Sequence, residues 1–193
     1  MKLHLLAAIM VAVGVPAIRP ALAGNLVING DFTAVGTIFP WSFVAPYSGA
    51  SGVGGGDPPP EGNSFVFAAQ SPVSDTIEQS LSTTPGQSYT IDFLLAHPSS
   101  GTYSFSGDFN GTSFISLGPS TGTFAYTDYS ITELATSSAT TLAFTGSVLG
   151  IHGLYLAKVS VTAAPEPSTM VLAGLAAAGL AVMKLRRRRH SRP

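Results

Sequence analysis

Short apolar runs alternate with turn-forming residues along the middle of this 193-residue chain. Tyr89, Ile91, Phe93 and Leu95 occupy every second position of one run, the period of a strand with one buried face. No stretch of the middle region has an apolar period close to that of a helix, so no helix is predicted there. The expected strands are residues 25–28, 41–45, 64–68, 76–81, 88–95, 103–109, 112–117, 124–131, 140–144 and 155–162.

Turn residues between these runs predict how the strands connect. Asn110-Gly111 separates two aromatic-rich runs, which predicts a hairpin with a type I′ turn. Many short strands at close spacing predict an all-β domain over residues 24–164, and we expect a jelly-roll β-sandwich. Residues 48–63 are rich in glycine and then in proline, a composition that predicts a flexible loop.

The first 23 residues have the organisation of a secretory signal peptide: a basic start, an apolar stretch and a small-residue end. The apolar stretch 5–15 is too short to span a bilayer comfortably. Ala21 and Ala23 offer the small side chains that signal peptidase requires, so cleavage is predicted before Gly24. The alternative is a retained N-terminal anchor.

The C-terminal end, residues 165–193, combines an extended motif, an apolar segment and a basic cluster. The motif is Pro165, Glu166, Pro167 and Ser168. Residues 169–185 are almost wholly apolar, and as a helix they would extend ~26 Å, close to the ~30 Å of a hydrocarbon core. A transmembrane helix is therefore predicted there, with the tail 186–193 in the cytoplasm and the domain outside it. The basic cluster is Arg186, Arg187, Arg188 and Arg189.

Charge and composition exclude several functions for the middle region. Between residues 24 and 164, Lys158 is the only lysine or arginine against nine acidic residues, a formal charge of −8. Such a surface repels phosphate backbones, so nucleic acid is not an expected partner. The chain has no cysteine, which excludes disulfides, thiolate metal sites and a cysteine nucleophile.

No motif of an enzyme is found in the chain. There is no G-x-S-x-G, no H-E-x-x-H, no EF-hand loop and no phosphate loop. Asp75 and Glu78 are three apart on an expected strand, so their carboxylates point to opposite faces and do not form a glycosidase pair. His97 and His152 are expected to make hydrogen bonds at loop edges. We therefore expect neither catalysis nor a cofactor.

The order of Pro-Glu-Pro, apolar helix and basic cluster between residues 165 and 189 resembles the PEP-CTERM sorting signal. Members of that family are substrates of exosortases, membrane-embedded proteases of Gram-negative bacteria whose genes often accompany exopolysaccharide biosynthesis. The resemblance implies a protein that signal peptidase and then an exosortase process. The alternative is a plain C-terminal anchor on a proline-bearing stalk.

The middle region resembles the galactose-binding-like jelly-roll domains of exported proteins. The resemblance lies in residues 25–32, in Trp41-Ser42, in residues 78–90 and in the closing runs 142–144 and 155–161. It implies a carbohydrate-binding module, in which aromatic rings stack on the apolar faces of sugars.

Trp41 and Tyr47 are the candidate ligand residues, with Tyr126 and Tyr129 behind them. A tryptophan in the core is the alternative for Trp41. Tyr126 and Tyr129 are three apart and are not expected to share a strand face.

The resemblance also implies a structural calcium ion, but two positions depart from that pattern. Thr33 follows the first-turn Phe32 where an acid is usual, and Ala157 and Lys158 replace the usual acid pair of the last strand. An ammonium repels a cation, so we expect no metal; instead Lys158 would pair with Asp31. The alternative is a solvated lysine.

Together these features predict an exported surface or matrix protein that binds carbohydrate weakly, in connection with exopolysaccharide or biofilm. Two alternatives stay open. The domain could be purely structural, with no small ligand. More distantly, threonine-rich stretches such as Thr121-Gly122-Thr123 suggest ice binding, although no regular threonine repeat supports it.

Overall fold

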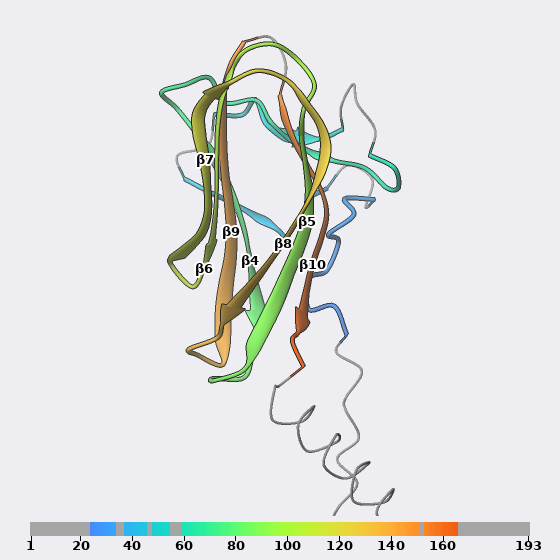
Figure 1. The fold of residues 1–193 in the computed structure, drawn as a ribbon, viewed down its shortest axis with the longest axis vertical. Coiled ribbons are helices and arrows are strands. Elements are labelled where there is room, and N and C mark those ends of the chain that lie inside the picture. Colours follow the sequence, from blue (N-terminus) through green and yellow to red (C-terminus); the bar gives the residue numbers. More distant parts are fainter. Residues whose placement is uncertain (1–23, 34–36, 46–47, 55–58, 151–152, 166–193) are drawn as a thin grey trace, which may run out of the picture.

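The computed structural model describes residues 24–33, 37–45, 48–54, 59–150 and 153–165, and this part of the chain is all-β (Figure 1). The strands are β1 (Ser42–Val44), β2 (Gly52–Val53), β3 (Phe65–Phe67), β4 (Asp75–Ser82), β5 (Ser88–His97), β6 (Thr102–Phe109), β7 (Thr112–Thr121), β8 (Phe124–Leu134), β9 (Ala139–Leu149) and β10 (Leu154–Ala163).

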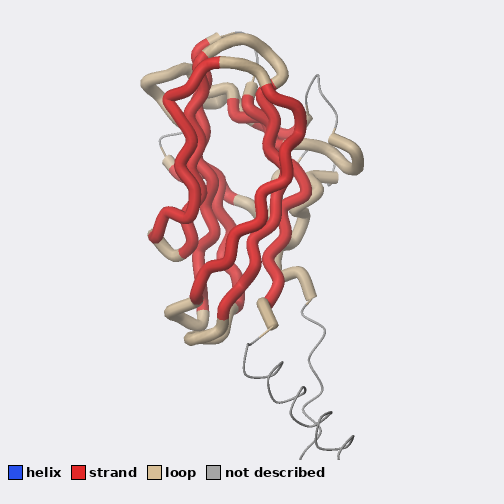
Figure 2. Tube along the Cα trace, viewed as in Figure 1, coloured by secondary structure: helices blue, strands red, loops and turns tan. Residues whose placement is uncertain are grey.

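The strands form two five-stranded sheets that face each other (Figure 2). Sheet A has the order β1-β4-β9-β6-β7, and sheet B has the order β2-β3-β10-β5-β8. Every strand pair within them is antiparallel. The predicted β-sandwich is confirmed. In the strand order of the two sheets, β7 and β8, which are consecutive in the chain, are edge strands of different sheets.

The hairpin between β6 and β7 shows how local sequence sets this fold. Asn110 and Gly111 both have positive φ, 55° and 79°, as a type I′ turn requires. Residues 25–28, by contrast, do not form the expected strand. The Asn25 side chain accepts hydrogen bonds from the Val27 and Val161 amides, so a side chain takes the place of a ladder partner.

Aromatic rings fill the space between the sheets. The inward positions of β5 are buried, as the alternation of apolar residues predicts. Phe144 of β9 lies at the centre of this core: its ring centroid is 5.3 Å from that of Phe93 and 5.8 Å from that of Phe105. The buried apolar cluster runs from Val27 to Val161, so the sandwich holds a core of its own.

Residues 48–54 are more ordered than their composition suggests. Gly52–Val53 forms β2 and pairs with β3, and the fully buried carboxylate of Asp75 anchors the turn before it. Asp75 accepts hydrogen bonds from the Ser48 amide at 2.7 Å and from the Ser51 hydroxyl at 2.6 Å. The expectation of a flexible loop is therefore corrected for the described residues, because a buried carboxylate needs these donors.

Segments that the sequence assigns to export lie outside the described residues. They are the signal peptide 1–23 and, from residue 166 onward, the predicted transmembrane helix and basic tail. Within the part that the structure describes, no helix is long and apolar enough to cross a membrane.

Candidate functional site

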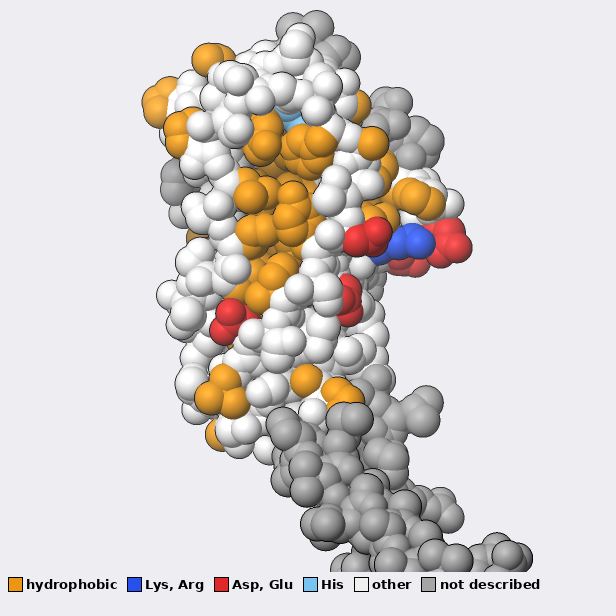
Figure 3. Space-filling model, in the orientation of Figure 1, with side chains coloured by type: hydrophobic (Ala, Val, Ile, Leu, Met, Phe, Trp, Pro, Cys, Tyr) orange, Lys and Arg blue, Asp and Glu red, His pale blue; other side chains and the backbone are white. Residues whose placement is uncertain are grey.

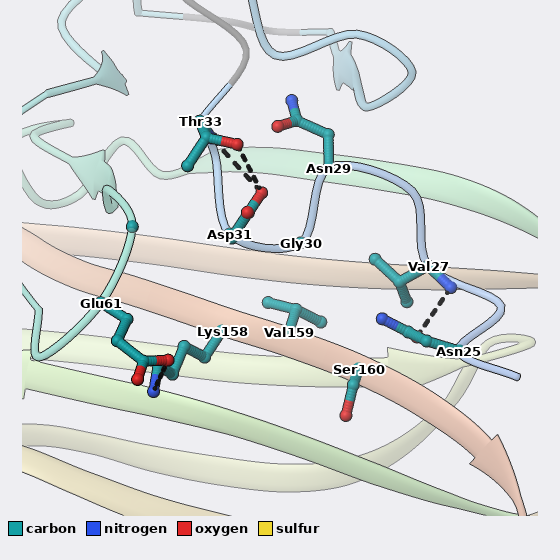
Figure 4. A pocket seen from close by; sticks show the side chains of 11 residues that line it. Asn25, Val27, Asn29, Gly30, Asp31, Thr33, Glu61, Lys158, Val159 and Ser160 are labelled. Atoms are coloured by element: carbon teal, nitrogen blue, oxygen red, sulfur yellow. Dashed lines mark hydrogen bonds and ion pairs between the residues drawn. The ribbon is translucent and has the colours of Figure 1, made fainter.

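A polar pocket of about 550 Å³ lies where the N-terminal segment and the loop before β3 meet β10 (Figure 4). Gly30 and Val159 form its floor: the Val159 amide donates to the Gly30 carbonyl at 2.9 Å. A Cβ on Gly30 would lie 2.0 Å from the Val159 carbonyl oxygen, so only glycine permits this approach. The pocket is therefore built on a close contact of two backbones.

Lys158 enters this pocket from a β-bulge in β10. The register of β10 against β5 shifts between Ala157 and Ser160, and Lys158 has a φ of 51°. Its ammonium lies 3.0 Å from a carboxylate oxygen of Glu61. The structure thus pairs Lys158 with Glu61, and the predicted pair with Asp31 is wrong.

Asp31 lines the same pocket but turns toward its own loop (Figure 4). Its carboxylate accepts hydrogen bonds from the Thr33 hydroxyl at 3.0 Å and from the Thr33 amide at 3.4 Å. Aspartate in a turn usually accepts hydrogen bonds from a residue two positions away, as Asp31 does here from Thr33. Sequence spacing alone does not favour Lys158 over Thr33 as the partner of Asp31.

Among the described residues, no group of three or more histidine, cysteine or acidic side chains is arranged to hold a metal ion. The pocket carries one ammonium and two carboxylates, those of Asp31 and Glu61. Since Glu61 is 80% exposed, its ion pair with Lys158 is well solvated and contributes little stability.

Trp41, expected to stack on a sugar, belongs to the core. It is only 3% exposed, its ring packs against Phe32 and Phe144, and its indole N–H donates to the Asn29 carbonyl at 3.2 Å. No face of the ring is left for a ligand, so the expectation is corrected. Tyr47 lies outside the described residues.

The largest apolar surface in view lies between β7 and β8, where the sandwich stays open at one side (Figure 3). Half-buried side chains from both sheets gather there and pack against the core. We call this set the aromatic strip: Tyr103, Phe114, Leu117, Phe124, Tyr129 and Ile131.

Tyr129 is the best placed ring of the aromatic strip. It lies opposite Phe93 in the β5–β8 ladder, and the two rings stack with centroids 5.1 Å apart and planes 8° apart. Burial, and then the nearby phenol of Tyr103, raise the pKa of Tyr129 above its ordinary value. Its hydroxyl therefore stays protonated at physiological pH and can donate a hydrogen bond.

Tyr103 is held at the same opening by an aromatic cluster. Its ring centroid is 5.3 Å from that of Phe124 and 4.8 Å from that of His97. His97 is buried, and its Nδ1 lies 2.7 Å from the Gly122 carbonyl oxygen. This confirms a structural histidine at a loop edge; His152 lies outside the described residues.

The sandwich ends where the sorting residues begin. The Ala164 amide still donates to the Ser88 carbonyl at 2.8 Å, and Pro165 is exposed. Of the residues assigned to export, Gly24 and Pro165 are described; Ala21, Ala23, Glu166, Pro167, Ser168 and the arginine cluster are not.

Residues 163–189 match the PEP-CTERM protein-sorting motif. The chain carries a PEP-CTERM sorting signal. The match covers the end of β10, the Pro-Glu-Pro motif, the apolar segment and the arginine cluster, the same three parts that the sequence indicates. No curated protein matches the chain.

Solved structures similar to this chain are mostly carbohydrate-binding modules. TmCBM61, solved with β-1,4-galactotriose, has a TM-score of 0.53 at 15% identity, over 74% of this chain and all of that one. The xylan-binding CBM22-1 domain of Paenibacillus barcinonensis Xyn10C has a TM-score of 0.51 at 9% identity, over 77% and 99% of the two chains.

A domain of tailspike protein 4 of bacteriophage CBA120 is also similar, with a TM-score of 0.51 at 17% identity. The match covers 72% of this chain but only 21% of the phage domain, so the chain spans about a fifth of that domain. Because the sequence identities are low, these matches show a shared β-sandwich fold only.

Sequence reasoning singled out Tyr129 but missed Tyr103 and Phe124. Each occupies an inward-facing position in the alternating pattern of its strand, and its neighbours in the sequence do not distinguish it from a core residue. What exposes these rings is the position of β7 and β8 at the open side, which depends on sheet order.

If the Lys158 ammonium fills the place that a metal would need, calcium should not stabilise the protein. We expect ~1 mM CaCl₂ to leave the melting temperature unchanged. We expect Lys158→Ala to lower the free energy of unfolding by less than ~1 kcal/mol. Thermal melts with and without EDTA measure both. A melting temperature that rises with calcium concentration in the unaltered protein would overturn this assignment.

Proposed function

We propose that this chain is an exported cell-surface protein, processed by an exosortase, whose β-sandwich binds neutral carbohydrate through the aromatic strip. The observation that carries the proposal is the Tyr129 ring, stacked on Phe93 at the opening between the sheets. The likeness to carbohydrate-binding modules in fold supports the ligand class.

Stacking on sugars requires a rigid ring with one free face. Phe93 supports one face of Tyr129 and fixes its orientation, so binding a sugar to the other face costs little side-chain entropy. The hydroxyl of Tyr129 supplies a donor, and Glu133, two residues beyond Ile131 on the same face of β8, supplies an acceptor. These are the few polar groups around an apolar platform that a sugar site needs.

The charge of the domain limits the class of polysaccharide that it can bind. With −8 between residues 24 and 164, it would repel anionic polysaccharides, so the proposed ligand is neutral. Catalysis is not part of the proposal: Asp75 is buried behind hydrogen bonds, and Glu78 lies on the opposite face of β4. Hydrolysis of a glycosidic bond needs two carboxylates that flank it.

The sorting signal supplies the location. The two prolines of the motif favour an extended backbone, so the segment that follows β10 would offer a protease an accessible stretch between the domain and the predicted membrane helix. Exosortase cleavage there would release a domain of formal charge −8 and leave the arginine cluster behind. A role in the exopolysaccharide matrix or biofilm follows from a neutral-glycan ligand at that location.

Processing predicts a shortened protein. Intact-mass spectrometry of the protein recovered from the producing cell's surface or medium should show a C-terminus before Arg186. Replacing Pro165 and Pro167 by alanine should keep the chain in the membrane fraction at its unprocessed mass. Released protein that still carries all of Arg186 to Arg189 would contradict exosortase processing.

Binding through the aromatic strip predicts that Tyr129→Ala weakens the affinity for a neutral glycan ~3- to 10-fold, since the stacking contact is lost. Affinity electrophoresis in gels containing xylan or β-1,4-galactan measures this. Tyr129→Phe should retain most of the retardation because it keeps the ring.

Leu134→Ala, at an exposed position of the same strand, is the matched control. Circular dichroism checks that each variant is folded. Equal retardation of Tyr129→Ala and the unaltered protein would argue for a different binding site. Absence of retardation of the unaltered protein by any neutral glycan would favour the purely structural alternative.

A further inference from the structure

The outer face of sheet A carries hydroxyl side chains in register across four strands. Thr145 of β9 lies opposite Thr76 of β4 on one side and Ser106 of β6 on the other. Ser106 in turn lies opposite Ser116 of β7. One row across the sheet therefore presents four hydroxyl groups, and a second row places Ser104 opposite Ser147.

Part of this face is hollowed into a groove of about 360 Å³, walled by the turn before β4. This volume lies near the lower end of the ~300–1,000 Å³ typical of ligand pockets. None of the residues that line it is charged. We call it the hydroxyl groove and define it by Ser74, Ser104, Ser106, Ser116, Thr145 and Ser147.

The hydroxyls of the groove are largely unpaired. Ser147 is only 8% exposed, it lies on the groove side of β9, and its hydroxyl has no hydrogen-bond partner among the described residues. The hydroxyls of Ser104, Ser106 and Ser116 likewise have no partner there, whereas Thr145 is bonded to Thr76 at 2.7 Å. The Ser147 hydroxyl is not among the enclosed polar atoms that lack a partner in the described residues, so it opens onto the groove and is available to an external partner.

A partner for these groups must offer many hydrogen bonds and little charge. Serine has a single side-chain torsion, and its hydroxyl both donates and accepts, which suits the hydroxyl groups of a sugar. The row beside the groove places Glu78 and Asp108 on either side of Ala143, so an anionic polymer would meet two carboxylates. The chemistry of the groove fits a neutral glycan.

We propose that the hydroxyl groove is a second carbohydrate site, separate from the aromatic strip; the ligand class rests on the function proposed above. The two sites share β7: Ser116 lines the groove, and Leu117, which also borders the groove, packs its side chain against the core at the strip. One chain would then hold glycan on both faces of an edge strand, by stacking on one side and by hydrogen bonds on the other. Such a protein binds two polysaccharide segments at once.

The test compares four forms of the full chain: unaltered, Tyr129→Ala, Ser106→Ala with Ser147→Ala, and all three changes together. Affinity electrophoresis uses gels containing xylan or β-1,4-galactan, in a detergent without a sugar head group. The matched control is Ser80→Ala with Thr141→Ala, a facing pair on the same sheet face outside the groove.

The groove variant should lose at least ~5-fold in affinity, the contribution of about one neutral hydrogen bond, while the control pair changes nothing. The triple variant should bind more weakly than either parent, because two sites are lost. If the groove variant binds like the unaltered protein while Tyr129→Ala binds more weakly, the groove proposal is overturned and the strip stands. If the groove variant binds more weakly while Tyr129→Ala binds like the unaltered protein, the groove stands and the strip proposal fails.

Discussion

The packing of aromatic rings between the two sheets is the interaction on which this structure depends. The chain has no cysteine, so no disulfide ties the sheets together. Phe144 of sheet A instead contacts Phe93 of sheet B and, within its own sheet, Phe105 and Phe114. Burying each such ring contributes roughly 1.5–3 kcal/mol. The same packing determines the proposed function, because these rings continue to the open side of the sandwich.

At that open side, core and surface are one continuous layer. Phe93 is buried, and Tyr129, which is half-buried, stacks on it. The strip is rigid because the core supports it, and it is exposed because β7 and β8 are sheet edges that do not pair with each other. The outer face of sheet A has the opposite character, with short hydroxyl side chains and no basic residue in the groove. An acidic domain with these two surfaces is suited to neutral, polyhydroxylated polymers.

Local patterns in the sequence predicted most of the fold. Alternation identified the inward face of β5, and Asn110-Gly111 identified the β6–β7 hairpin, because both depend on neighbours in the chain. The strand β2 was missed, since two residues of a glycine-rich segment pair only through β3 and the buried Asp75. The C-terminal sorting signal was recognised because its three parts follow one another in sequence.

The candidate site was harder to predict, because it depends on contacts between distant segments. The ring of Trp41 is of the kind that stacks on sugars, but Phe32 and Phe144 pack around it, so it lies in the core. Lys158 shares its pocket with two acids; Asp31 accepts a hydrogen bond from the Thr33 hydroxyl, and Lys158 pairs with Glu61. Tyr129 acquires its role only from the sheet order, which no local period encodes.

The central claim is that neutral glycan binds at the aromatic strip of a self-contained sandwich. NMR titration of residues 24–164 with xylohexaose or β-1,4-galactotriose tests it most directly, because amide shifts locate the ligand residue by residue. The account predicts saturable shifts that include Tyr129 and Ile131 and leave the Lys158 pocket unchanged. Shifts confined to the Lys158 pocket, or none at all with either sugar, would contradict it.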